Sequence, residues 1–323
     1  MFIPHTSSSV RFTGRFAPDG DAMTATATGS RIEIAFKGNQ IVLSFNIDDC
    51  VLPFPHLWIR VDGGARVETA VDRWLTVETK DDGEHYLEII FKGAKEIQNR
   101  WYAPLQNKLS FYGYEADGEA QLWPDDRKTI ELVGDSITEG VLTYDRRYYP
   151  NDQDNRVFED DVCRTYGWLT AQGLGLRSLH MGYGAVGVTR AGCGSVPKAA
   201  EAYPYCWDGA PVTYDHPDFV MINHGANDRG NTEAKYIEEY RGLLELVRKT
   251  HPDAKIICLS AFCGAYPEAL GKLVDEFNAE HNDDVFYVDA TLWVPLEPLH
   301  PLTDGHKIIA DRLIPILKER YSL

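Results

Sequence analysis

The chain has 323 residues, enough for two domains of ordinary size, and its hydrophobic fraction of 44% is normal for a protein with a proper core. The formal net charge of −17 argues against nucleic acid or an anionic membrane surface as a partner, because both need a basic face. The first ten residues, MFIPHTSSSV, predict no secretory signal, and no apolar run approaches membrane-spanning length.

The six cysteines contain no CxxC pair and no spacing typical of zinc ligands, so no metal site is expected from them. We expect free thiols and a cytoplasmic protein, because thiols stay reduced in that compartment. A bridge between Cys193 and Cys206 is expected only if the chain is exported.

From the first residue to about residue 120, apolar and polar residues alternate with a period of two, which is typical of strands with one buried face. Residues 32–36 and 41–47 alternate in this way on either side of Gly38 and Asn39, which predicts a β-hairpin. A second hairpin turn is indicated at residues 62–64, and further strands are expected at residues 57–61, 85–91 and 109–114. The sequence therefore predicts an antiparallel β-sandwich over residues 1–122.

The segment 121–128 contains a proline and four charged residues, and we place a domain boundary there. Beyond it, over residues 129–323, short apolar runs alternate with segments of helical spacing. Strands are expected at residues 130–133, 178–181, 219–222, 255–259 and 285–288, and helices at residues 232–250, 267–280 and 304–320. This order predicts a doubly wound parallel α/β sheet, whose ligands bind outside the carboxyl ends of the strands.

Polar or glycine-rich segments follow four of these strands. The heptapeptide GDSITEG at residues 134–140 comes first, then a glycine loop at 182–187, the block HGAND at 224–228, and the run EPLHP at 297–301. Because carboxyl ends of parallel strands meet at one edge of a sheet, the four segments are expected to converge. A serine at such a turn lies beside the unpaired N–H groups at the start of a helix, a position that suits a catalytic nucleophile. The alternative is that Ser136 is an ordinary helix N-cap.

These four segments resemble the blocks of the SGNH, or GDSL-type, hydrolases: GDSITEG, a glycine loop, GAND for the GxND block, and ExxHP where the family usually has DxxHP. A β-sandwich placed before such a domain is similar to carbohydrate esterase family 2 and related acetylesterases. The resemblance implies a flavodoxin-like α/β domain preceded by a jelly-roll-like sandwich.

The resemblance also implies roles for individual residues. Ser136 is the nucleophile, and His300 is its general base and later the acid for the leaving alcohol. The backbone N–H groups of Ser136 and Gly187 and the side-chain amide of Asn227 hold the oxyanion. Alternatives remain open for two of these residues: Asn227 can cap the following helix, and Gly184 is a rival of Gly187.

The acid that orients the histidine departs from the family pattern. Glu297 stands where an aspartate is usual, and its side chain is one methylene longer, so a backbone carbonyl is the alternative orienting group. Asp304 is a weaker substitute. Two further histidines compete for attention: the family pattern makes His306 structural, and His224 is best explained by packing.

The segment 141–161 is polar and rich in tyrosine, as lids and binding loops often are. Tyr144, Trp207 and Trp293 are candidate platforms for sugar rings, with core packing as an equal alternative for each. We therefore predict a serine esterase that removes small acyl groups from a small-molecule or oligosaccharide ester, with acetyl as the expected group. No metal or organic cofactor is expected. The alternatives are a short-chain lipase-like esterase or thioesterase on a non-sugar substrate, and a carbohydrate-binding protein with a silent hydrolase domain.

Overall fold

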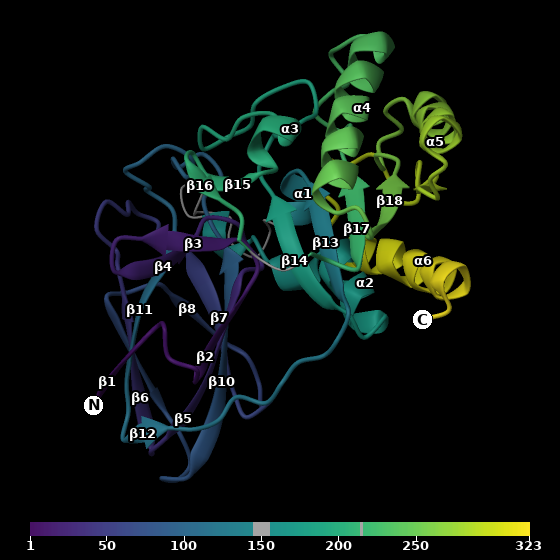
Figure 1. The fold of residues 1–323 in the computed structure, drawn as a ribbon. Helices are drawn as coiled ribbons and strands as arrows, with labels where there is room; N and C mark the ends of the chain where they lie inside the picture. The colour runs from purple at the N-terminus through teal and green to yellow at the C-terminus, as the bar shows by residue number, and fades with distance from the viewer. Residues whose placement is uncertain (145–155, 214–215) are drawn as a thin grey trace.

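Two antiparallel sheets pack face to face in the N-terminal part of the protein, and a parallel sheet covered by helices follows (Figure 1). The computed structural model describes residues 1–144, 156–213 and 216–323. The first sheet holds β1 (Phe2–Pro4), β3 (Phe16–Asp19), β4 (Ala22–Ala25), β6 (Gln40–Phe45), β9 (Trp74–Glu78) and β11 (Leu109–Glu115). The second holds β2 (Val10–Thr13), β5 (Arg31–Lys37), β7 (His56–Val61), β8 (Val67–Ala70), β10 (Glu84–Gly93) and β12 (Gly118–Glu119). The predicted antiparallel sandwich is confirmed.

The core of the sandwich is built from the alternating apolar residues that the sequence shows. Side chains of β5 and β6 enter it from opposite sheets, and all of them are fully buried: Ile32, Ile34, Phe36, Ile41, Leu43 and Phe45. Burial of this kind stabilises the fold by about 25 cal/mol for each Å² of apolar surface removed from water.

One predicted pairing in the sandwich is wrong. β5 pairs with β2, β10 and β12, whereas β6 pairs with β9 and β11, so the turn at Gly38 and Asn39 carries the chain from one sheet to the other and does not close a hairpin. A period of two shows which face of a strand is buried, but it does not show which strand lies beside it. The second predicted hairpin is confirmed, because β7 and β8 pair directly.

The α/β part has the predicted parallel sheet, with strand order β14-β13-β17-β18-β19. Its strands are β13 (Thr129–Gly134), β14 (Arg177–Gly182), β17 (Phe219–Asn223), β18 (Lys255–Leu259) and β19 (Phe286–Val288), and a small separate sheet pairs β15 (Tyr205–Trp207) with β16 (Ala210–Pro211). The helices are α1 (Ser136–Glu139), α2 (Tyr166–Gly173), α3 (Ala199–Ala202), α4 (Glu233–Thr250), α5 (Pro267–His281) and α6 (Thr303–Tyr321), with 3-10 turns η2 (Arg156–Phe158) and η3 (Val162–Arg164).

Helices cover both faces of the parallel sheet, as Figure 1 shows. The apolar side chains of α4 and α5 pack on one face, against the alternate residues of β17 and β18 that point there. Those of α2 and α6 pack on the other face. The doubly wound α/β class is therefore confirmed, and the strand order is the one in which ligands bind between the first and third strands, here β13 and β17.

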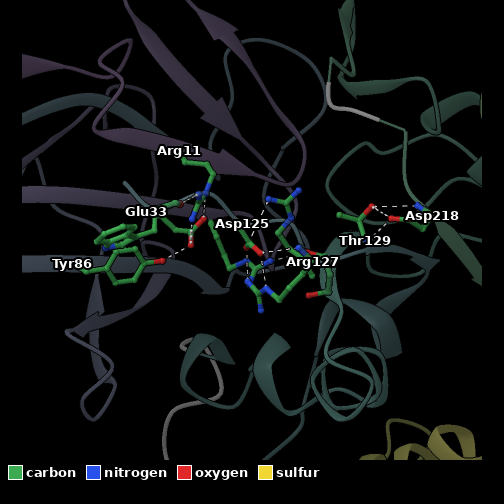
Figure 2. A network of polar contacts seen from close by, with 11 residues as sticks. Arg11, Glu33, Tyr86, Asp125, Arg127, Thr129 and Asp218 are labelled. Carbon is green, nitrogen blue, oxygen red and sulfur yellow. Dashed lines mark hydrogen bonds and ion pairs between the residues drawn. The ribbon is translucent and has the colours of Figure 1, made fainter. Parts of the chain in front are cut away.

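The segment between β12 and β13 crosses from the sandwich to the sheet and is tied down on both sides. Figure 2 shows Asp125 and Arg127 of this segment beside the sandwich residues Arg11, Glu33 and Tyr86. Arg127 donates two hydrogen bonds to the Asp125 carboxylate, at 2.8 and 2.6 Å, and Arg11 donates one to the carbonyl of Trp123 at 2.8 Å. At the far end, the Asp218 carboxylate accepts the backbone N–H of Thr129 at 2.8 Å (Figure 2). The predicted boundary falls within this segment.

No disulfide forms among the six cysteines, all of which the structure describes, so Cys193 and Cys206 are not bridged. Among the helices of the described residues, none is both long and apolar enough to cross a membrane.

Candidate active site

The nucleophile block forms a tight strand–helix turn at the carboxyl end of β13. Asp135 is the N-cap of α1, and its carboxylate accepts the backbone N–H of Ile137 at 2.9 Å. Ser136 is the first residue of the helix, so the alternative of Ser136 as N-cap is wrong. Gly134 is required by close packing, because a Cβ atom there would lie 2.1 Å from Thr138 Oγ1. Gly140 ends the short helix with a φ of 95°, which only glycine adopts without strain.

Ser136 and His300 meet, although 164 residues separate them in the sequence. Ser136 Oγ lies 2.8 Å from His300 Nε2, within hydrogen-bond distance, and the Ser136 residue is only 6% exposed. A general base must reach the hydroxyl proton that it removes, and this distance allows that transfer.

The two rival histidines occupy structural positions. His306 is fully buried on α6, and its Nδ1 accepts the backbone N–H of Tyr166 at 3.1 Å while its ring stacks on the Tyr166 ring. Burial lowers the pKa of His306 to about 3, so this imidazole stays neutral. His224 is also buried, and burial lowers its pKa to about 4. Neither imidazole forms a hydrogen bond with Ser136 in the described part of the chain.

The predicted orienting acid does not reach the histidine. Glu297 is exposed, and no hydrogen bond or ion pair joins its carboxylate to any residue that the structure describes. Asp304 is likewise exposed, in the first turn of α6. The group that orients His300 thus stays a prediction.

Asn227 lies beside the nucleophile turn. Its side-chain amide donates to Asp135 Oδ2 at 3.2 Å and to the carbonyl of Val186 at 3.1 Å. Because Asp135 adjoins Ser136, these bonds place a neutral N–H donor next to the serine. The structure therefore brings together Ser136, His300 and Asn227.

Gly187 is a different case. Its backbone N–H donates to the carbonyl of Arg190 at 3.1 Å, so an oxyanion would have to replace that bond, and the assignment of Gly187 to the oxyanion hole stays a prediction. Packing explains the glycine, because a Cβ atom at this position would lie 2.5 Å from Asp228 Oδ1. The rival Gly184 has a similar explanation, since a Cβ atom there would lie 2.3 Å from Glu96 Oε2.

Asp228 is a supporting residue whose role the sequence analysis missed. Its buried carboxylate accepts the backbone N–H and the hydroxyl of Thr189, at 2.8 and 2.6 Å, and the N–H of Val188 at 3.3 Å. These bonds join the glycine loop to the GAND block. A carboxylate directly after Asn227 is the sequence signal that could have suggested such a link.

The sandwich also touches the nucleophile helix. Arg100, from the loop after β10, forms a buried ion pair with Glu139 at 2.6 Å, with the two side chains 0% and 2% exposed. Thr28 Oγ1 of the sandwich donates to the carbonyl of Glu139 at 2.8 Å. A second buried pair, Arg15 with Glu131 at 3.0 Å, joins the sandwich to the middle of β13. Both parts of the molecule therefore fix the position of the serine turn.

The three predicted sugar platforms do not share one environment. Trp207 is 7% exposed and belongs to the apolar core, so its ring is no sugar platform and the prediction is wrong there. Tyr144 is half-buried, donates its hydroxyl to Asp161 at 3.2 Å and lies under the Arg164 guanidinium. Trp293 is half-buried, with Arg312 over its ring. Residues 145–155 of the predicted binding loop lie outside the described residues.

Within residues 1–144, 156–213 and 216–323, no group of three or more His, Cys, Asp or Glu side chains is arranged to hold a metal ion. The chemistry that the described side chains themselves support is nucleophilic attack by a serine with a histidine as its base.

A serine–histidine pair at the carboxyl edge of a parallel sheet defines a hydrolase that works through a serine nucleophile. The chain belongs to the GDSL-like lipase/acylhydrolase family, whose model matches residues 132–308, more than half of its length. This match confirms the predicted family and its class, the hydrolases of carboxylic esters.

Similar proteins extend the likeness over both parts of the chain. The cellulase/esterase CelE of Acetivibrio thermocellus is 26% identical over 344 residues, which cover 96% of this chain and 39% of that protein, so this chain spans well under half of that curated relative. A family two carbohydrate esterase from Clostridium thermocellum, solved in complex with cellohexaose, has a TM-score of 0.78 at 22% identity and covers 97% of this chain and 99% of its own. An acetyl xylan esterase from the rumen bacterium Butyrivibrio proteoclasticus has a TM-score of 0.78 at 17% identity, and the match covers 100% of this chain and 98% of that one. At these identities the two structures show a shared fold.

Proposed function

We propose that this protein is a serine esterase that removes acetyl and other small acyl groups from carbohydrate. The observation that carries the proposal is the 2.8 Å contact between Ser136 Oγ and His300 Nε2 at the carboxyl edge of the parallel sheet. Support for a carbohydrate substrate comes from the relatives, since CelE is named as a cellulase/esterase and the structural neighbours as carbohydrate esterases.

The reaction uses the described groups in two halves. His300 Nε2 takes the hydroxyl proton of Ser136 as Oγ attacks the ester carbonyl, and the same proton then goes to the leaving sugar oxygen. A water molecule next loses a proton to His300, attacks the acetyl-serine carbonyl and releases acetate, and the proton returns to Ser136.

The negative oxygen of each tetrahedral intermediate needs hydrogen-bond donors. The backbone N–H of Ser136, at the start of α1, and the amide of Asn227 are the two donors that we assign. The present bonds of Asn227, at 3.1 and 3.2 Å, lie at the long end of the N–H···O range, so a charged oxygen competes well for one of these hydrogens. The N–H of Gly187, whose bond to the Arg190 carbonyl is 3.1 Å long, stays a predicted third donor.

A panel of esters tests the proposal. We expect kcat/KM to be highest for acetylated xylo- or cello-oligosaccharides and to fall along p-nitrophenyl acetate, butyrate and octanoate. Acetyl-coenzyme A serves as the thioester control and is expected to be a poor substrate. A preference for octanoate would favour a lipase-like esterase, and a preference for the thioester would favour a thioesterase. Absence of turnover on the whole panel would favour a binding protein with a silent hydrolase domain.

A further inference from the structure

The outer face of the first sandwich sheet carries a groove that the proposed esterase reaction does not use. It has a volume of about 800 Å³, and all of its lining residues lie between Phe2 and Glu115, so none comes from the α/β part that holds Ser136. Its strands β1, β6 and β11 lie on the left of Figure 1, away from the parallel sheet.

The strand register explains why this surface is hollow. Pro4 pairs with Gly113, Gly113 with Ser44, and Ser44 with Trp74, so these four residues form one row across β1, β11, β6 and β9. Neighbouring strands lie about 4.8 Å apart, so the row spans about 14 Å. The middle of the row has only a glycine and a serine, and Tyr112 and His5 line the groove beside it.

Two exposed aromatic rings line this groove: Trp74 ends the row, and Phe2 lies on β1, two residues before Pro4. Trp74 is 66% exposed and Phe2 is 52% exposed. The Phe2 ring lies against the backbone of Gly113, because a Cβ atom there would be 2.9 Å from Phe2 Cζ. Neither ring contributes to the core, whose residues from these strands, such as Ile3 and Phe45, point the other way.

Polar groups with free hydrogen-bonding capacity line the same groove. Ser44 Oγ and the carboxylates of Asp21 and Glu115 form no hydrogen bond or ion pair with any described residue. Arg73 is the cation of the groove, and Asp48 already pairs with it at 2.7 Å. The two free carboxylates leave the groove acidic, in a chain whose formal net charge is −17, so an anionic polymer is excluded as its ligand.

We propose that this groove binds a neutral oligosaccharide chain and acts as a second, non-catalytic carbohydrate site. The apolar faces of sugar rings pack on Trp74 and Phe2, while their hydroxyls bond to the free polar groups that line the same groove. The groove is separate from the Ser136 site, so its binding does not depend on the esterase reaction.

Affinity electrophoresis of the full chain tests this site, with hydroxyethyl cellulose and neutral xylan as probes and polygalacturonate as the anionic control. We expect at least one neutral polymer to retard the native chain and Ser136→Ala alike, and polygalacturonate to retard neither. Trp74→Ala is expected to weaken binding about tenfold or more, and Phe2→Ala to weaken it in the same direction. The matched control is Trp123→Ala, which removes a tryptophan that is 80% exposed outside the groove and is expected to change nothing.

Hydrolysis of p-nitrophenyl acetate is expected to be the same in the native chain and in the Trp74, Phe2 and Trp123 variants. The proposal is overturned if neither neutral polymer retards the native chain, or if Trp74→Ala is retarded as strongly as the native chain. Sedimentation checks the other possible occupant: a native dimer that Trp74→Ala converts to a monomer would assign the groove to a second copy of this chain. An inactive native chain that still binds through Trp74 would contradict the esterase proposal alone.

Discussion

Asp135 accepts hydrogen bonds from two parts of the site at once, the N–H of Ile137 at 2.9 Å and the amide of Asn227 at 3.2 Å. It is 1% exposed, and burial raises its pKa to about 7, because the charged form loses its hydration. An unfolded aspartate has a pKa of about 3.9. Between about pH 4 and 7 the folded state thus keeps a proton that the unfolded state has lost.

This difference predicts a pH dependence of stability. The contribution of Asp135 to the free energy of unfolding is expected to fall as pH rises from about 4 to 7, by a few kcal/mol at most, because ionised Asp135 is disfavoured in the folded state. The buried His224 and His306, whose pKa values are lowered, contribute in the opposite direction. Asp135→Asn removes this group, so the difference in unfolding free energy between the native chain and the variant is expected to fall over the same range, while Glu139, His224 and His306 contribute alike to both proteins. Urea unfolding at a series of pH values measures it, with the exposed Asp304→Asn as control. An equal slope in the native chain and Asp135→Asn would contradict the assignment.

The short helix α1 is held by the sandwich as well as by its own strand. Burial raises the pKa of Glu139 to about 7, and the guanidinium of Arg100 opposes that rise. Removing one partner of a buried ion pair leaves an uncompensated group and costs about 3–5 kcal/mol. Loss of Arg100 therefore affects both stability and the position of the helix that begins with Ser136.

Two matched variants separate these effects. Arg100→Met is expected to lower kcat about 10- to 100-fold with little change in KM, because a small displacement of the nucleophile is costly. Arg15→Met breaks a similarly buried pair, but with Glu131 inside β13, and is expected to cost comparable stability with kcat per folded molecule unchanged. Arg100→Lys keeps the charge and is expected to recover part of the activity. Equal kcat in the Arg100→Met and Arg15→Met proteins, each corrected for its folded fraction, would show that Arg100 has no positioning role.

The elements also show what the sequence can and cannot predict. The strands of the parallel sheet follow from short apolar runs, and the meeting of Ser136, Asn227 and His300 follows from their places after those strands. The strands that pair with β5 and β6 cannot be predicted from the sequence. The alternation of apolar and polar residues shows which face of a strand is buried, but it does not show which strand lies beside it.

Single hydrogen bonds and degrees of burial are harder to predict. The N–H of Gly187 is engaged by a carbonyl three residues further on in its own loop, and no pattern in the glycine loop reveals that bond. Trp207 is buried by tertiary packing. The short polar segment around it in the sequence gives no sign of that burial. The ion pair between Arg100 and Glu139 depends on how the sandwich packs against the α/β part, which the sequence does not show.

At the scale of the whole molecule, an acidic two-part protein brings a serine and a histidine together across 164 residues, and the sandwich supports the serine turn from the other side. The central claim is that Ser136 is the nucleophile of an esterase. Labelling of the folded protein with a fluorophosphonate, followed by peptide mass spectrometry and paired with acetyl ester turnover, tests it most directly.

We expect one label per chain on Ser136, none in Ser136→Ala, and slower labelling in His300→Ala. Turnover by Ser136→Ala is expected to fall by about 10⁴-fold or more, as for the loss of other serine nucleophiles. A label on another residue, or acetyl ester turnover that survives Ser136→Ala, would contradict the account.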